Sequence, residues 1–286
     1  MRMDQNRILE LKKTALEVRK DVVRMIGLSR ASNLGFSLSV VDILTVLYFY
    51  SLSLNPEDPK WPKRDRLILG KSDAAPALYA VLARKGFFDR EELWSYRKLG
   101  AMLQGTLDAR RTPGVEAPGI GPGLALGIAN GVAAACRADY SPARVFCFIG
   151  DDELLEGSIW ESVQTASTLR LGNLAAIVEV HDREPGDGKG DIGLPKTAAQ
   201  RFEAFGWKTI VCDGHSAESL AEAFSLCGRE KDTPLAVIAK TRWGKGISSL
   251  ENRNMKAPIA PNRERVENAL LELEKEGKRL AEEMEE

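Results

Sequence analysis

Two short apolar runs, Val145-Phe-Cys-Phe-Ile149 and Leu174-Ala-Ala-Ile-Val-Glu-Val180, decide the fold class. Runs of this length and content are typical of strands that are covered on both faces, as in parallel sheets. The residues between them, from Glu156 to Leu171, have the composition of a helix. A strand, a helix and a second strand in this order predict an α/β fold, with a parallel sheet flanked by helices.

The same alternation continues toward the C-terminus. Two further runs, Thr209–Cys212 and Leu235–Ala239, are expected to be strands on either side of a helix from about Ser216 to Cys227. A charged segment at about 262–286 is expected to form a solvated terminal helix. We find no internal repeat and no low-complexity linker, so residues 1–286 are expected to form a single domain.

Three helices are expected before the sheet. Apolar residues recur at helical spacing over Ile8–Ile26. Ser39 is a suitable N-cap for a second helix that runs through Phe49. A third helix is expected to follow Asp73 and to end at Gly86, because glycine readily adopts the left-handed conformation that closes a helix.

Composition excludes several classes of function. Apolar residues make up 44% and charged residues 28% of the chain, and the formal net charge is −1. This charge gives no reason to expect nucleic acid or an anionic membrane as a partner. The uncharged stretch Ala117–Cys136 contains too many glycines and prolines for a membrane helix and reads as a glycine-rich loop that leads into a helix. No secretory signal is visible, so we expect a cytoplasmic protein whose four cysteines are buried thiols.

Five groups of motifs resemble the N-terminal half of transketolases, in the same order and over about two hundred residues. Gly150-Asp-Asp-Glu-Leu-Leu-Glu-Gly157, for example, is similar to the family pattern GDGELQEG. The other groups are Asn55–Arg66, Thr112–Glu116, Arg201–Trp207 with Asp213–His215, and Lys240–Gly246. The resemblance implies the thiamine-diphosphate-binding fold of the transketolase diphosphate domain.

The resemblance also implies partners. A transketolase contains a pyrimidine-binding domain and a C-terminal domain after this part, so the chain resembles the N-terminal subunit of a split transketolase. We therefore expect a C-terminal, pyrimidine-binding transketolase-like subunit as its partner, together with self-association to an α2β2 assembly. Thiamine diphosphate and Mg²⁺ are the cofactors that the family implies.

Positions that carry cofactor-lining histidines in transketolases hold other residues in this chain. The family stretches SGHPGG, KGHA and QGHPD align with segments that place Asn33, Asp73 and Thr106 at the histidine. A further family histidine belongs to a WHG triplet, which is missing from the segment after Gly246. Only two histidines are present in the whole chain. No catalytic residue is therefore secure, although Glu156 is retained at a position that contributes to contact between active sites in the family.

The diphosphate motif is altered in the same way. By resemblance, Asp151 and the residue thirty positions later, His181, stand at the metal ligands, where the family has Asp and Asn. Asp152 replaces the second glycine of the family's Gly-Asp-Gly. The other cofactor-binding positions that the resemblance implies are Gly150, Gly123 and Lys245.

Simple energetics indicate that these changes oppose cofactor binding. A carboxylate about 4 Å from a diphosphate oxygen is unfavourable by roughly 4 kcal/mol at an effective dielectric constant of 20. Mg²⁺ prefers oxygen ligands, so imidazole is a poor replacement for an amide. A loss of about 5 kcal/mol weakens binding some thousandfold.

Other interpretations of these residues stay open. Asp152 can turn outward as a solvated loop residue. His181 can be a plain hydrogen-bonding residue, or it can bind a transition metal together with acidic neighbours. His215 is expected to be structural, and Asp73 and Asp108 to be loop carboxylates. The acidic neighbours considered for the metal site are Asp151, Asp152, Glu179 and Asp182.

Three functions follow from these interpretations. The first is a transketolase-like subunit with a degenerate cofactor site and impaired or lost ketol transfer. The second is an active thiamine-diphosphate-dependent transferase of two-carbon ketol units that works with a C-terminal partner. The third is a non-enzymatic binding module that uses the vacated cleft for another ligand, such as a cation.

Overall fold

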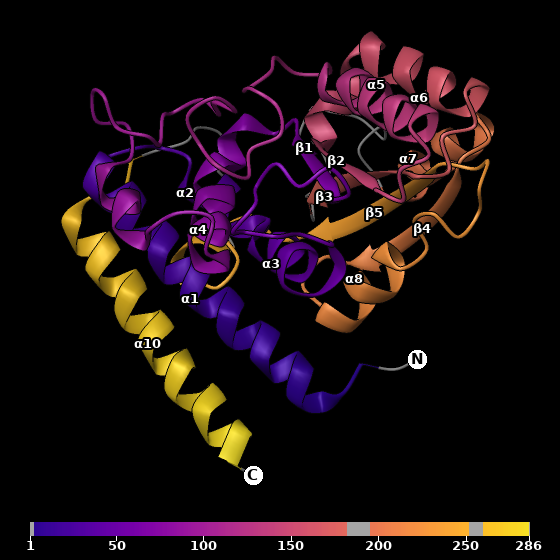
Figure 1. Ribbon diagram of the computed structural model, residues 1–286. Coiled ribbons are helices and arrows are strands. Elements are labelled where there is room, and N and C mark those ends of the chain that lie inside the picture. The colour runs from indigo at the N-terminus through magenta and orange to yellow at the C-terminus, as the bar shows by residue number, and fades with distance from the viewer. Residues whose placement is uncertain (1–2, 182–194, 252–259, 286) are drawn as a thin grey trace.

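A computed structural model describes residues 3–181, 195–251 and 260–285. Its centre is a five-stranded sheet with the strand order β1-β2-β3-β5-β4, in which every pair of neighbours is parallel (Figure 1). The strands are β1 (Arg66–Leu69), β2 (Val145–Gly150), β3 (Leu174–His181), β4 (Lys208–Asp213) and β5 (Leu235–Thr241). The parallel α/β fold predicted from the apolar runs is confirmed.

Helices cover both faces of the sheet, because successive side chains of a strand point to opposite faces. Phe146 and Phe148 pack with the helices of one layer, and Val145 and Cys147 pack with those of the other. The first layer holds α1 (Gln5–Ser29), α2 (Leu34–Ser39), α3 (Val41–Val46), α4 (Ala75–Lys85) and α8 (Ala217–Phe224). The second layer holds α5 (Ala125–Ala138), α6 (Gly157–Thr168) and α7 (Pro195–Ala204). Figure 1 shows the two layers below and above the sheet.

Short helical segments connect these elements. They are a π-helical turn η1 (Leu47–Ser51), the 3-10 turns η2 (Ser72–Ala74), η3 (Arg90–Ser95) and η4 (Asp151–Leu155), and the short helix α9 (Ser248–Glu251). None of the helices in the described part of the chain has the length and apolar character that a bilayer span requires. The Ala117–Cys136 stretch forms the predicted loop followed by α5.

Two local predictions from the sequence differ from the structure. Ser39 does not cap a helix: it is the last residue of α2, and its hydroxyl donates to the carbonyl of Phe36 at 3.0 Å. Only Val40 separates α2 from α3, so the backbone at Ser39 is already helical. Strand β1 was not among the expected strands, because its four residues begin with a charged arginine and give only a short apolar run.

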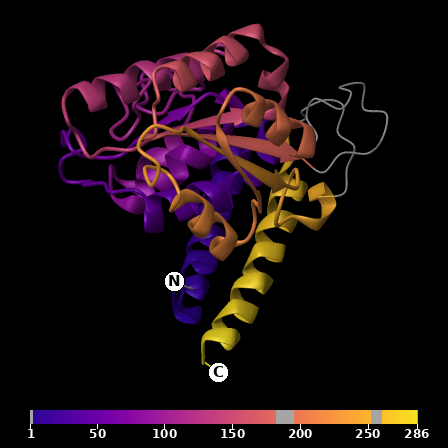
Figure 2. The ribbon, with the colours of Figure 1, turned by 90° about the vertical axis from the view of Figure 1, so that its right-hand side faces the viewer.

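The terminal helix α10 (Arg263–Glu285) forms where the sequence predicts it, but it is not solvated on all sides. Figure 2 shows α10 and α1 side by side. Ala269, Leu273 and Leu280 of α10 are buried in the core cluster that includes α1. The expectation of a solvated helix fails because these apolar residues recur at helical spacing within a segment that is otherwise charged.

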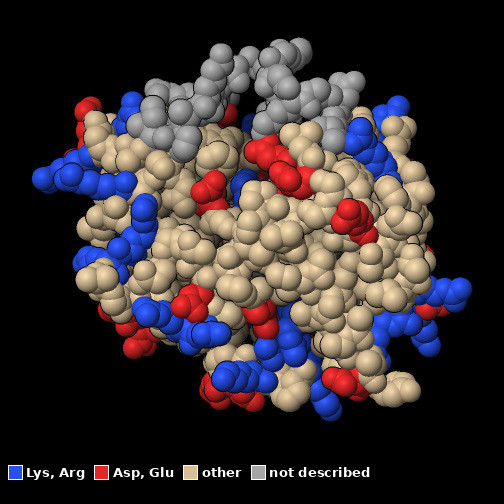
Figure 3. All heavy atoms as spheres, turned by 90° about the horizontal axis from the view of Figure 1, so that it is seen from above, with Lys and Arg blue, Asp and Glu red and all other residues tan. Residues whose placement is uncertain are grey.

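The face seen from above in Figure 1 is where α5 and α6 lie, and Figure 3 shows a broad tan area on this face with several acidic side chains near its middle. Exposed apolar side chains on or beside these two helices are Leu124, Ile128, Leu155 and Leu169. We call these four residues the α5–α6 face. A groove of about 360 Å³ runs between the helices and is lined by small residues such as Gly127 and Gly131 and by the carboxylate residue Glu161.

Candidate functional site

The candidate site lies at the carboxyl ends of the central strands, where parallel sheets bind their ligands. Strand β2 ends at Gly150, which is in register with Glu179 of β3. Immediately after β2, the chain turns into η4, in which Asp151 is buried and Asp152 is exposed. The structure thus places the altered diphosphate motif at the edge of the sheet that the strand pattern indicates.

His181, the last residue of β3, lies between two carboxylates. Its Nδ1 is 3.7 Å from Asp151 Oδ2, and its Nε2 is 3.4 Å from Glu179 Oε1. The Nε2 atom is buried and has no hydrogen-bond partner. The structure therefore brings together the two residues assigned to metal binding, but an imidazole ring occupies the space between the carboxylates.

Glu179 is fully buried, and its charge is compensated by a lysine that follows β1, on the far side of β2 from β3. Lys71, two residues after β1, forms an ion pair with Glu179, and Thr241 Oγ1 donates to Glu179 Oε1 at 3.0 Å. Burial alone raises the pKa of Glu179, but Lys71 and His181 hold this pKa below its ordinary value. The sequence indicates Glu179 only as a neighbour of a metal site and gives no sign of Lys71 or Thr241 as its partners. One signal was available: Glu179 is a single acidic residue within an apolar strand, and a buried charge requires a partner.

Glu153 holds the two glycines that were assigned to cofactor binding. Its Oε1 accepts from the Gly123 amide at 3.1 Å, and its Oε2 accepts from the Gly150 amide at 2.8 Å. Burial raises the pKa of Glu153, although these two amides act in the opposite direction. Both amides therefore point at a protein carboxylate in this structure. Glu153 also escaped the sequence analysis, although it lies within the GDDELLEG motif.

Gly123 is required by close packing as well as by its conformation. Its φ is +80°, and a Cβ atom there would lie 2.6 Å from Cβ of Glu156. Its carbonyl accepts from Ser158 Oγ at 2.9 Å. Glu156 itself is exposed at the N-cap position of α6, on the side of the molecule that carries the α5–α6 face.

Two of the three positions that the family resemblance places at histidines lie together. Asn33 Nδ2 donates to the carbonyl of Asp73 at 3.0 Å, while Asn33 Oδ1 is buried without a partner. The Asp73 side chain is exposed. Thr106 is also exposed, and its methyl group fills the space that a side chain at position 119 would need. None of these three side chains provides the titrating ring of a histidine.

The remaining predicted residues have local partners. Lys245 Nζ lies 3.4 Å from Glu251 Oε1, and the Lys245 carbonyl accepts from Arg19 Nε at 3.1 Å. Asp108 Oδ1 accepts from the Arg110 amide at 2.9 Å within a turn. The segment after Gly246 that lacks the WHG triplet falls mostly in residues 252–259, which are outside the described residues.

No group of three or more His, Cys, Asp or Glu side chains in the described parts of the chain is arranged to hold a metal ion. Asp182, one of the neighbours considered for such a site, lies outside the described residues. The four cysteines are buried free thiols, as the sequence predicts, and burial raises the pKa of Cys147 well above its ordinary value.

The described groups match a Mg²⁺-diphosphate poorly. Mg²⁺ needs oxygen ligands in nearly octahedral geometry, and here a nitrogen ring stands beside Asp151. A diphosphate needs donors and cations, but Lys71 is engaged by Glu179, and the Gly123 amide by Glu153. Asp152 adds a negative charge to the loop where the family has glycine.

The family model for the thiamine diphosphate binding domain of transketolase matches residues 12–265. The 6-deoxy-6-sulfo-D-fructose transketolase subunit SqwG of Clostridium sp. (strain MSTE9) is 34% identical over 269 residues, which is 94% of this chain and 98% of that subunit. Human transketolase is 37% identical over 257 residues, which is 87% of this chain, but the matched part is only 40% of the human protein.

Solved structures agree with these sequence matches. Transketolase from Leishmania mexicana superposes with a TM-score of 0.77 at 21% identity, covering 95% of this chain and 46% of that chain. Transketolase from Campylobacter jejuni has a TM-score of 0.76 at 25% identity, with 96% and 48% covered. The chain therefore belongs to the transketolase family and corresponds to its N-terminal, thiamine-diphosphate-binding domain.

Proposed function

We propose that this chain is the N-terminal subunit of a two-component transketolase-like assembly, and that its own cleft has impaired or lost binding of thiamine diphosphate with Mg²⁺. Ketol transfer at this cleft is correspondingly weak or absent. The observation that carries the proposal is the position of His181, whose ring lies between Asp151 and Glu179.

The physical argument concerns the metal and the charge. An imidazole beside Asp151 offers Mg²⁺ a nitrogen in place of an oxygen, and it fills the space between the two carboxylates. If Asp152 approaches a bound diphosphate to about 4 Å, the repulsion is roughly 4 kcal/mol. The chain has no histidine at three family positions to compensate, since Asn33, Asp73 and Thr106 stand there.

The assembly part of the proposal is supported by the lengths of the relatives. The chain matches 98% of a relative that is named as a subunit, but only 40% of human transketolase. The pyrimidine-binding part of the site is then supplied by a second chain. The α5–α6 face is apolar and exposed, which supports self-association of this chain and hence an α2β2 arrangement.

Co-expression with a C-terminal transketolase-like subunit from the same organism tests both parts of the proposal. We expect the two chains to co-purify as a complex and to show weak or no two-carbon ketol transfer when Mg²⁺ and thiamine diphosphate are supplied. Ketose phosphates and 6-deoxy-6-sulfo-D-fructose serve as donors, because the latter appears in the name of a relative. Transfer that requires both chains and is as fast as that of human transketolase in the same assay overturns the impairment, and failure to associate overturns the subunit role.

An active transferase with a rearranged site is the second candidate, and one observation favours it. Glu153 holds the Gly123 and Gly150 amides in a single buried network, so the frame of the diphosphate loop is intact. In this case the same assay gives transfer, and Asp151→Asn abolishes it without disrupting the complex. Wild-type activity that is unchanged in Asp151→Asn instead indicates a contaminating enzyme.

A further inference from the structure

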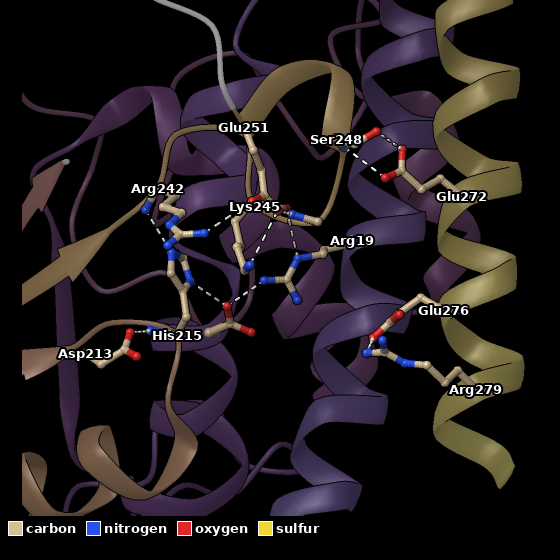
Figure 4. A network of polar contacts seen from close by, with 12 residues as sticks. Arg19, Asp213, His215, Arg242, Lys245, Ser248, Glu251, Glu272, Glu276 and Arg279 are labelled. Carbon is tan, nitrogen blue, oxygen red and sulfur yellow. Dashed lines mark hydrogen bonds and ion pairs between the residues drawn. The ribbon is translucent and has the colours of Figure 1, made fainter. Parts of the chain in front are cut away.

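One carboxylate oxygen organises two side chains that hold the loop after β5. Asp42 Oδ2, on α3, accepts from Arg19 Nη2 at 2.5 Å and lies 2.8 Å from His215 Nδ1. Arg19 Nε donates to the carbonyl of Lys245, and the Arg242 amide donates to His215 Nε2 at 2.8 Å (Figure 4). The backbone of the Arg242–Ile247 loop is thus fixed at two points, three residues apart.

These partners define the hydrogen position on the His215 ring. The Arg242 amide is only a donor, so Nε2 must accept and carries no hydrogen. The hydrogen of the neutral ring is therefore on Nδ1, where it is donated to Asp42. A protonated ring has N–H groups at both positions. Protonation therefore removes the acceptor for Arg242 and places two N–H groups opposite each other.

The His215 ring is held in place from its own side. Its backbone amide donates to Asp213 Oδ1 at 2.8 Å, and the Gly214 amide donates to the Lys240 carbonyl at 2.8 Å. A Cβ atom at Gly214 would lie 2.6 Å from the Thr241 methyl, so this turn packs tightly on β5. The His215 side chain is 12% exposed. Rotation of the ring away from Arg242 is therefore restricted, and the loop is the part that can yield.

The loop in turn contacts α2, which borders the candidate site because the Phe36 ring on this helix lies 5.3 Å from Nζ of Lys71, the partner of Glu179. The Gly244 amide donates to the Gly35 carbonyl at 3.1 Å. The Trp243 ring lies against Gly35 so closely that a Cβ atom there would be 2.0 Å from it, and it meets the Phe36 ring edge-on at 6.0 Å between centroids. Helix α2, which carries these residues, begins directly after Asn33. The position of the loop is therefore transmitted to α2 through Trp243.

We propose that His215 is a pH-sensitive positioning residue for the cleft wall. As a neutral ring it holds the Arg242 end of the Arg242–Ile247 loop and keeps the neighbouring Trp243 on α2, and its protonation releases this end of the loop. The charged groups that face this ring or its loop are Asp42, Arg19, Asp213, Arg242, Lys245 and Glu251. The proposal does not depend on whether the cleft binds a cofactor.

Two half-replacements of His215 separate its roles. The side-chain oxygen of His215→Gln can accept from the Arg242 amide, and the amide nitrogen of His215→Asn can donate to Asp42. We measure the tryptophan emission of each protein between pH 5 and 8 and subtract the emission of its Trp243→Phe counterpart. Wild type is expected to show a transition that both replacements lose, with His215→Gln held near the high-pH emission and His215→Asn near the low-pH emission.

His181→Gln is the matched control, because His181 is the only other histidine in the chain. It is expected to retain the transition. A transition that persists in both His215 variants, or one that disappears in His181→Gln, overturns the proposal. So does wild-type emission from Trp243 that is constant over this pH range.

Nitrogen NMR of the wild-type imidazole rings provides a test that does not depend on a variant folding. At pH 8 we expect the Nδ1–H tautomer for His215, and an Nε2–H tautomer contradicts the proposal. On lowering the pH, the hydrogen-exchange rate of the Arg242 amide, corrected for its intrinsic pH dependence, is expected to rise by about fivefold. This ratio corresponds to the loss of about 1 kcal/mol, the size of one hydrogen bond. Corrected exchange that does not change with pH contradicts release of the loop.

Discussion

Nδ1 of His181 lies 3.7 Å from Oδ2 of Asp151, at the carboxyl ends of the two central strands. The resemblance to transketolases assigns both residues to a metal site, and in the structure the His181 ring lies between Asp151 and Glu179. The other ring nitrogen faces the fully buried Glu179. The imidazole ring of His181 therefore fills the space between the carboxylates of Asp151 and Glu179 at these strand ends.

Restoring the family residues at two positions is expected to improve cofactor binding. The double variant Asp152→Gly/His181→Asn removes a carboxylate from the diphosphate loop and returns an amide oxygen to the metal position. We expect binding of thiamine diphosphate with Mg²⁺ to strengthen at least about tenfold, or about 1.4 kcal/mol. Isothermal titration of both proteins measures the change. The control Asp139→Gly removes an exposed carboxylate at the C-terminal end of α5 and should bind like wild type. Equal affinities of wild type, the double variant and the control contradict the prediction.

The Lys71–Glu179 pair is expected to matter more for stability than for binding. Lys71→Met leaves the fully buried Glu179 without its cation, which should lower the free energy of unfolding by about 3–5 kcal/mol. The double variant Lys71→Met/Glu179→Gln removes both charges and keeps an acceptor for Thr241, so its loss should be clearly smaller. Urea unfolding of the three proteins gives the comparison. Equal losses in the single and double variants mean that the charge of Glu179 is not the cause.

Acid should destabilise the fold through Asp42. Burial alone raises the pKa of Asp42, but Arg19 and His215 hold this pKa far below its ordinary value of 3.8. Because the folded-state pKa is depressed, the ionised carboxylate stabilises the fold above the unfolded-state pKa, and that contribution is lost as the pH falls below about 4. Asp42→Asn should therefore have lower stability at pH 7 and a flatter dependence of the unfolding free energy between pH 5 and 3. The prediction is contradicted if the unfolding free energies of wild type and Asp42→Asn depend on pH in the same way.

The α5–α6 face should control self-association. Leu124 and Ile128 are 52% and 37% exposed, so a charge at either position has little effect on the folded monomer. We expect Leu124→Asp and Ile128→Asp to shift the chain toward monomer by at least about tenfold in dissociation constant, measured by sedimentation equilibrium. Leu99→Asp, which changes a fully exposed leucine in a turn outside this face, is the control. A wild-type monomer, or the same shift in Leu99→Asp, counts against the face as the interface.

The strands that sequence analysis located are those with continuous apolar runs. Val145–Ile149 and Leu174–Val180 have no competing pattern, because both faces of each strand are buried. Strand β1 escaped because its four residues give no periodicity, and it is recognised only when it pairs with β2. Ser39 was misjudged because helix α2, which it ends, is too short to leave a periodic signal.

The residues of the candidate site also fall into two groups: those that sequence motifs indicate, and those that only the fold brings together. Motif alignment placed Asp151 and His181 at one strand edge, and the structure brings them together. It gave no sign of the Lys71–Glu179 pair, because the two residues are 108 positions apart and only the sheet order makes them neighbours. The loop held by His215 depends likewise on contacts that no local pattern encodes, because they join α1, α3 and the turn after β4 to the loop after β5.

The central claim is that this cleft does not bind the family cofactor in the usual way. Its most direct test is an isothermal titration of thiamine diphosphate with Mg²⁺ into the wild-type chain, alone and in complex with its C-terminal partner, with human transketolase as the positive control. The account predicts no binding in the micromolar range in either state. Micromolar binding that is lost in Asp151→Asn contradicts it, because that result shows Asp151 serving as a metal ligand beside His181.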